Sequence, residues 1–294
     1  MDPVLHQAYV ANEDPTTPPY PVSVSVIDTR TRAVTATIAV DQLFVRETQP
    51  IVIDSATHLV YVLGVGTTGA LAVIDPATNS VTARIPIEGA IDPAAVAIDS
   101  DRHRVYVASQ YDRTVVAIDT RSRAVVATVS VGENPAALAV DPHSHQVWVA
   151  TAAGASVIDP DAFTVSATID AGDQPEALAV DSDMHTAYLT DFHGNSVTLV
   201  DTATHAMSRI PLKLEPSYAV AVDPALHTVY LTSGAFGSIT MIDTRTHQIT
   251  ASRLTVDPHS GSHWTGGIAV DPTTHEIYVT QGESSQTVEI LAPA

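Results

Sequence analysis

Three polar residues in one short segment have the chemistry of a metal or catalytic centre. Asp257, His259 and His263 lie close together in sequence, and Trp264 follows directly. Imidazole nitrogens and carboxylate oxygens bind divalent transition metals, and the same groups act as general acids and bases. Their spacing is that of a loop and does not place them on one helix face. Two interpretations stay open: a site that holds a divalent metal, and solvated loop side chains that need no cofactor.

Further residues of the same chemistry would complete an enzyme site if the fold brought them together. The candidates are His193 and the carboxylates of Glu133, Glu176 and Glu215. Such a set would suit a lyase, hydrolase or cyclase that acts on a small molecule. The sequence has no Gly-x-Ser-x-Gly motif and no glycine-rich phosphate loop, so serine hydrolase and nucleotide-binding functions are disfavoured.

Aromatic and arginine side chains offer a second kind of site, which binds a ligand without catalysis. The candidates fall outside the repeating pattern described below, and they are Tyr20, Tyr111, Phe192, Tyr218, Phe236, Trp264, Arg46 and Arg113. Aromatic rings stack on ring-shaped and cationic ligands. Binding is our leading hypothesis, with a small molecule, sugar or peptide as the partner. An enzyme is the first alternative, and a structural cell-surface module is the second.

A repeat along the whole chain accounts for most of the other histidines and aromatics. In each copy an Asp is followed four residues later by His and seven residues later by Tyr or Trp. The copies begin at Asp2, Asp54, Asp99, Asp141, Asp181, Asp223 and Asp271. Because 294 divided by seven is 42, seven copies of about 42 residues use the entire sequence. The aromatics are expected to pack in the core.

Within one repeat, four short β-branched segments alternate with turn residues. They cover residues 94–99, 104–109, 114–119 and 124–131. This pattern predicts four antiparallel strands, and four-stranded units at this spacing predict an all-β fold, a seven-bladed β-propeller. The first–second and third–fourth turns then share one face of each blade, here called the turn face. The remaining loops share the opposite face, the loop face, and nearly all the candidate aromatics fall there or at its edge.

The turns themselves carry a sequence signature. Each repeat His lies where one turn residue needs a left-handed backbone, which His tolerates better than most residues, and the repeat Asp is expected to accept backbone N–H bonds. The third–fourth turns follow the same rule. Each of these turns opens with an Asp, and the residues four positions after it are Arg32, Asn79, Arg123, Phe163, His205 and His247. These histidines are therefore interpreted as turn residues and not as ligands.

Several segments resemble a known repeat family. Tyr9-Val10-Ala11-Asn12 is followed by Val24 to Asp28, and later variants are Tyr278-Val279-Thr280 and Met241-Ile242-Asp243. In these motifs the whole chain resembles the YVTN-repeat (YncE-like) β-propeller family. The resemblance implies seven blades and a periplasmic or extracellular location. It leaves activity open, because the family includes surface-layer proteins, periplasmic binding proteins and relatives of streptogramin lyases.

The amino-acid composition disfavours several classes of binding partner. Thirteen basic and thirty-three acidic residues give a net charge of −20, which repels nucleic acid and anionic lipid. Apolar runs fall far short of the ~20 residues of a membrane-spanning helix, so neither nucleic acid nor membrane insertion is expected. The sequence has no cysteine, which removes disulfides and thiolate chemistry. The oligomeric state stays open.

The domain prediction is a single β-propeller over residues 1–294. In it the first repeat lacks its first strand, and the last repeat lacks its fourth. We therefore expect the natural chain to begin upstream. No signal segment is found at the amino terminus, so a cytoplasmic location is the alternative if no signal peptide precedes this sequence.

Overall fold

The computed structural model describes residues 1–13, 22–40, 50–64, 69–88, 92–172, 174–191, 196–212, 217–233, 237–254, 265–281 and 287–293. These residues form 26 β-strands and no helix, which confirms the all-β prediction for the described part of the chain. Consequently, nothing in those ranges is a helix long and apolar enough to span a membrane.

The chain divides into two compact units. Unit 1 contains residues Met1–Pro135 and Asp161–Thr164, and it holds three sheets. Sheet 1 consists of β1 (Gln7–Glu13), β2 (Val22–Asp28) and β3 (Ala33–Ala39). Sheet 2 consists of β4 (Ile51–Ile53), β5 (Val60–Gly64), β6 (Ala70–Asp75) and β7 (Ser80–Pro86). Sheet 3 consists of β8 (Pro93–Asp99), β9 (Arg104–Ser109), β10 (Thr114–Asp119) and β11 (Ala124–Ser130).

Unit 2 contains residues Ala136–Pro160 and Val165–Ala294, and it holds four sheets. Sheet 4 consists of β12 (Ala137–Val140), β13 (Val147–Thr151), β14 (Gly154–Asp159) and β15 (Thr164–Ile169). Sheet 5 consists of β16 (Pro175–Asp181), β17 (Thr186–Asp191), β18 (Ser196–Asp201) and β19 (Met207–Pro211). Sheet 6 consists of β20 (Ser217–Asp223), β21 (Thr228–Ser233), β22 (Ser238–Asp243) and β23 (Ile249–Leu254). Sheet 7 consists of β24 (Thr265–Val270), β25 (Ile277–Gln281) and β26 (Val288–Leu291).

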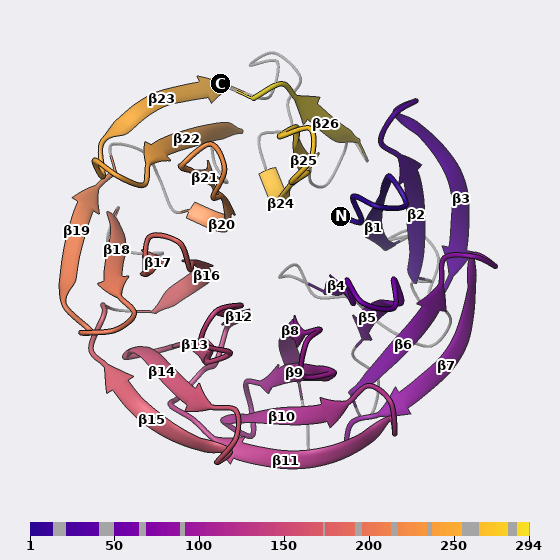
Figure 1. The fold of residues 1–294 in the computed structure, drawn as a ribbon, viewed down its shortest axis with the longest axis horizontal. Coiled ribbons are helices and arrows are strands. Elements are labelled where there is room, and N and C mark those ends of the chain that lie inside the picture. Colours follow the sequence, from indigo (N-terminus) through magenta and orange to yellow (C-terminus); the bar gives the residue numbers. More distant parts are fainter. Residues whose placement is uncertain are drawn as a thin grey trace. The chain divides into compact units, whose positions relative to one another are not determined.

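Every sheet has its strands in chain order, and the pairs are antiparallel (Figure 1). The repeat predicts this arrangement, because a short turn can join only antiparallel neighbours. Among the described residues the first and last sheets have three strands and the other five have four. Seven antiparallel sheets are therefore present, one for each copy of the repeat.

Within each unit, neighbouring sheets pack face to face. In unit 1 one apolar cluster joins Tyr61 and Leu71 of sheet 2 to Val107 and Ile118 of sheet 3. The repeat aromatics lie in these cores: Trp148, Tyr188 and other members are fully buried. Those with 4% exposure or less are Tyr61, Tyr106, Trp148, Tyr188, Tyr230 and Tyr278. The prediction that these aromatics are core residues is confirmed for the six.

The turn signature is also confirmed. All seven repeat histidines have positive φ, between 50° and 63°, and the six matching residues of the third–fourth turns have φ between 48° and 60°. The repeat Asp accepts backbone N–H bonds inside its turn, as Asp2 Oδ1 does from Val4 and Leu5, both at 3.0 Å. The backbone is thus left-handed at each of these positions, a conformation that His and Asn tolerate better than most residues.

Some repeat residues also bridge neighbouring sheets of the same unit. His58 Nδ1 of sheet 2 lies 2.7 Å from Asp2 Oδ2, next to sheet 1, and His275 Nδ1 of sheet 7 lies 2.8 Å from Asp223 Oδ2 of sheet 6. Between sheets 4 and 5 the Ser182 hydroxyl donates to Asp141 instead. Asp2, Asp141 and Asp223 therefore each stabilise their own turn and a contact with a neighbouring sheet.

The outermost strands of four sheets contain a β-bulge at the same place. In sheet 1, Val26 pairs with Ala36 but Ile27 pairs with Val34, so Thr35 is the extra residue. Its hydroxyl donates to the Val26 carbonyl at 3.2 Å. Sheets 2, 3 and 6 have the same register shift, and their extra residues are Thr82, Val126 and Thr250.

Candidate functional site

One hollow on the loop face of sheet 3 brings together three of the candidate residues. It has a volume of about 630 Å³ and is lined by Gln110, Tyr111, Arg113, Glu133 and Asn134. The first three belong to the loop between β9 and β10, and the last two follow β11. We call this space the Tyr111 hollow, and it lies entirely within unit 1.

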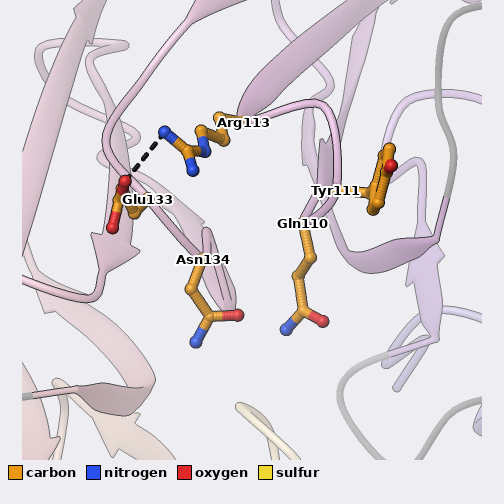
Figure 2. Close-up of a pocket in the computed structure, with 5 residues that line it drawn as sticks. All are labelled: Gln110, Tyr111, Arg113, Glu133 and Asn134. Atoms are coloured by element: carbon orange, nitrogen blue, oxygen red, sulfur yellow. Dashed lines mark ion pairs between the residues drawn. The ribbon is translucent and has the colours of Figure 1, made fainter.

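The hollow combines an ion pair, two carboxamides and an exposed ring. Arg113 Nη1 lies 2.8 Å from Glu133 Oε1, and both side chains are more than half exposed. Tyr111 is 75% exposed, the most exposed aromatic among the described residues. Figure 2 shows the carboxamides of Gln110 and Asn134 pointing in the same direction, with the ion pair on one side and the Tyr111 ring on the other.

The loop that carries these groups is held at three points. The Ser109 hydroxyl donates to Asp112 Oδ2 at 2.7 Å, and the Gln110 backbone N–H donates to the Asp92 carbonyl at 3.2 Å. The Val131 N–H donates to the Arg113 carbonyl at 2.9 Å. Because these bonds fix the loop, its exposed side chains start from a pre-organised backbone.

Two lining residues have a left-handed backbone. Arg113 has φ 56° and Asn134 has φ 50°, and Asn134 directly precedes Pro135. In sheet 6 the residue that matches Arg113, immediately before the third strand, is Gly237 with φ 53°. A residue with a Cβ pays about 1 kcal/mol in this region, a cost that glycine avoids. Arg113 therefore carries a guanidinium at a position where the fold would more easily accept glycine.

The other candidates do not line this hollow. Glu176 lies in β16 and Tyr218 in β20, both in unit 2. The remaining ligand-binding and catalytic candidates lie outside the described residues: Tyr20, Arg46, Phe192, His193, Glu215, Phe236, His259, His263 and Trp264. Asp257 of the predicted metal site also lies outside them. Within the described ranges, no three His, Asp or Glu side chains are close enough together to hold a metal ion.

Asn134 is a lining residue that the sequence reasoning missed. The sequence does contain a signal for it. Asn134 comes directly before Pro135 at the entry to an innermost strand, and Asn is a turn residue that accepts the left-handed region. The same signal occurs at Asp92–Pro93 and Gln174–Pro175, where Asp92 has φ 62° and Gln174 has φ 54°. Polar residues before these prolines thus have a repeated and strained conformation on the loop face.

The fold of this chain also occurs in other solved structures. No protein-family model matches the chain, and no curated protein matches it. A chain in the solved structure titled Kuenenia stuttgartiensis Hydrazine Synthase is similar to all of this chain and is itself covered to 94%, with 17% identity and a TM-score of 0.83. This chain is a seven-bladed β-propeller. At that identity the match establishes the fold of the propeller and leaves its activity to be inferred from the site.

Proposed function

We propose that this propeller is a ligand-binding protein of the YVTN-repeat class and that the Tyr111 hollow holds a small molecule. The observation that carries the proposal is that Tyr111, Arg113, Glu133 and two carboxamides line one loop-face hollow. Loops on a rigid sheet scaffold are where binding residues concentrate. The YVTN-class assignment rests on the repeat motifs of the sequence.

The size and chemistry of the hollow support a small ligand. Its volume of about 630 Å³ lies in the range of roughly 300–1,000 Å³ that is usual for small-molecule sites. The lining offers hydrogen-bond donors and acceptors beside one exposed ring. Arg113 lies beside Glu133 in this lining, at 2.8 Å, so both charged groups are held at the hollow.

A thermal-shift screen of a small-molecule library tests the proposal. A ligand that binds only the folded chain raises its melting temperature in a concentration-dependent way. We expect ligands whose shift is lost in Tyr111→Ala and in Arg113→Gly. The matched control is Arg123→Gly, which makes the same change at another left-handed arginine, φ 57°, in the third–fourth turn of sheet 3.

The results of the screen either support or contradict the proposal. Shifts that persist in Arg123→Gly but vanish in the two hollow variants support the proposal. Ligands whose shifts survive Tyr111→Ala and Arg113→Gly would contradict it, and so would a screen without any stabilising ligand. The enzymatic alternative depends on His193, His259 and His263, which lie outside the described residues, and it stays a prediction.

A further inference from the structure

We infer that the ligand of the Tyr111 hollow is a neutral saccharide. This inference rests on the proposed binding function and adds the chemical class of the ligand. It is argued from the charge of the lining, from its hydrogen-bonding groups and from the exposure of the Tyr111 ring.

The charge of the lining favours a neutral ligand. Arg113 and Glu133 are the two charged side chains that line the hollow, and they pair with each other at 2.8 Å. An anionic ligand would be repelled by the Glu133 carboxylate and by a chain with a net charge of −20. A cationic ligand would be repelled by the Arg113 guanidinium. A neutral ligand can instead bind beside the intact ion pair.

The hydrogen-bonding groups match hydroxyls. The carboxamides of Gln110 and Asn134 each offer a carbonyl acceptor and an NH₂ donor, and a sugar hydroxyl is also donor and acceptor at once. The ion pair adds guanidinium donors on one side and carboxylate oxygens on the other, and hydrogen bonds to charged groups are the stronger ones. Neighbouring hydroxyls on one sugar ring could therefore be satisfied by neighbouring side chains.

Tyr111 supplies the apolar part of the site. The residue is 75% exposed, so little of it is used in packing against the protein. A flat aromatic ring can cover the C–H face of a pyranose, and tyrosine does so with little loss of conformational entropy because it has few rotatable bonds. An exposed ring and two carboxamides in the same lining thus match the apolar and the polar surface of a sugar ring.

The decisive experiment compares two arrays of immobilised ligands, one of neutral oligosaccharides and one of unmodified peptides. Any saccharide that binds is then titrated by calorimetry against the full chain. We expect saturable binding of a neutral oligosaccharide, about tenfold weaker in Tyr111→Ala and in Gln110→Ala. Tyr111→Trp should retain binding because the larger ring still stacks, and Arg123→Gly should leave the affinity unchanged.

Failure of this inference can be told apart from failure of the proposed function. If peptides bind and neutral saccharides do not, and if Tyr111→Ala and Arg113→Gly abolish peptide binding, the hollow is a binding site but the saccharide class is wrong. If a saccharide binds equally well to Tyr111→Ala, Gln110→Ala and Arg113→Gly, the hollow is not its site. If neither array binds, the saccharide inference is wrong.

Discussion

The Nδ1 atom of His58 lies 2.7 Å from Oδ2 of Asp2, and only 2% of the Asp2 side chain is exposed. His275 and Asp223 repeat this relationship in unit 2, where the carboxylate is again 2% exposed. A third pair occupies the same repeat positions, Asp181 and His227, but there Oδ2 and Nδ1 are buried without a hydrogen-bond partner among the described residues. The three pairs form a natural series in which the same positions are bonded twice and unbonded once.

This series predicts that the substitution His→Asn lowers the free energy of unfolding by different amounts at His275 and His227. His→Asn keeps a residue that tolerates positive φ but cannot reach the neighbouring carboxylate. We expect His275→Asn to lower the free energy of unfolding by about 1–2 kcal/mol, because a buried carboxylate loses its hydrogen bond. His227→Asn, with no such bond to lose, should cost clearly less. Urea denaturation of both variants measures the difference, and equal losses would refute the stabilising role of the His275–Asp223 contact.

Asp141 predicts an acid-sensitive contribution to stability. Burial alone would raise the pKa of this carboxyl, but hydrogen bonds from Ser182, Ser144 and the backbone outweigh it, so the pKa is lowered. A lowered pKa stabilises the fold above the unfolded-state value, near 4, and this stabilisation is lost as the pH falls through the folded-state value.

Removing the Ser182 hydroxyl should therefore matter more at neutral than at acid pH. We expect Ser182→Ala to cost about 1–2 kcal/mol at pH 7 and visibly less near pH 3, measured by urea denaturation at each pH. The control is Ser122→Ala, which removes a similar bond to Asp119 on an exposed turn and should cost less. A Ser182→Ala cost that does not change with pH would contradict this account.

Gly154 at the start of β14 predicts a large backbone effect. Its φ is 132°, and an added Cβ would lie 2.3 Å from both the Ala171 nitrogen and the Ile169 oxygen. Because both obstacles are backbone atoms, Gly154→Ala should destabilise the protein by more than about 2 kcal/mol. Gly267→Ala is the control, since its Cβ would meet only Thr280 Oγ1, at 3.7 Å. Thermal unfolding that ranks the two variants equally would refute the steric argument.

Val126 predicts a stabilising substitution. It is the bulged residue of β11, and it is 45% exposed. The bulged residues Thr82 and Thr250 of other sheets use their hydroxyls to bond a carbonyl of the neighbouring strand, at 3.2 and 3.4 Å. Val126→Thr should add the same bond and raise the free energy of unfolding by about 0.5 kcal/mol. Val126→Ala, which adds no hydroxyl, should not raise it, and a gain in both variants would exclude the hydrogen bond as the cause.

The sequence predicted the scaffold well because the scaffold depends on local chemistry. Asp2 and its six counterparts each predict a turn within the next four residues. The left-handed backbone of the repeat histidines is a property of that turn. The aromatic three residues after each histidine falls on the second strand of its repeat, and these strands are buried along most of their length. None of these features requires knowledge of distant contacts.

The candidate site was less predictable because it depends on distance across the fold. Tyr111, Arg113 and Glu133 were each selected as loop-face residues, but their sequence separation does not show that β10 and β11 bring Arg113 within 2.8 Å of Glu133. Asn134 was not among the candidates, because the left-handed backbone of an Asn before a Pro was not used to select residues. The backbone strain at Arg113 appears only when its φ is compared with that of Gly237.

The bulges of the outermost strands have a consequence for the protein in concentrated solution. These strands display apolar side chains, with Val34 61% and Ile249 42% exposed, and such strands would pair readily with those of other molecules. A bulge bends its strand and increases the local twist, so the free backbone groups no longer present a straight row. Residues such as Thr35 thus help to protect the protein against intermolecular sheet formation and aggregation.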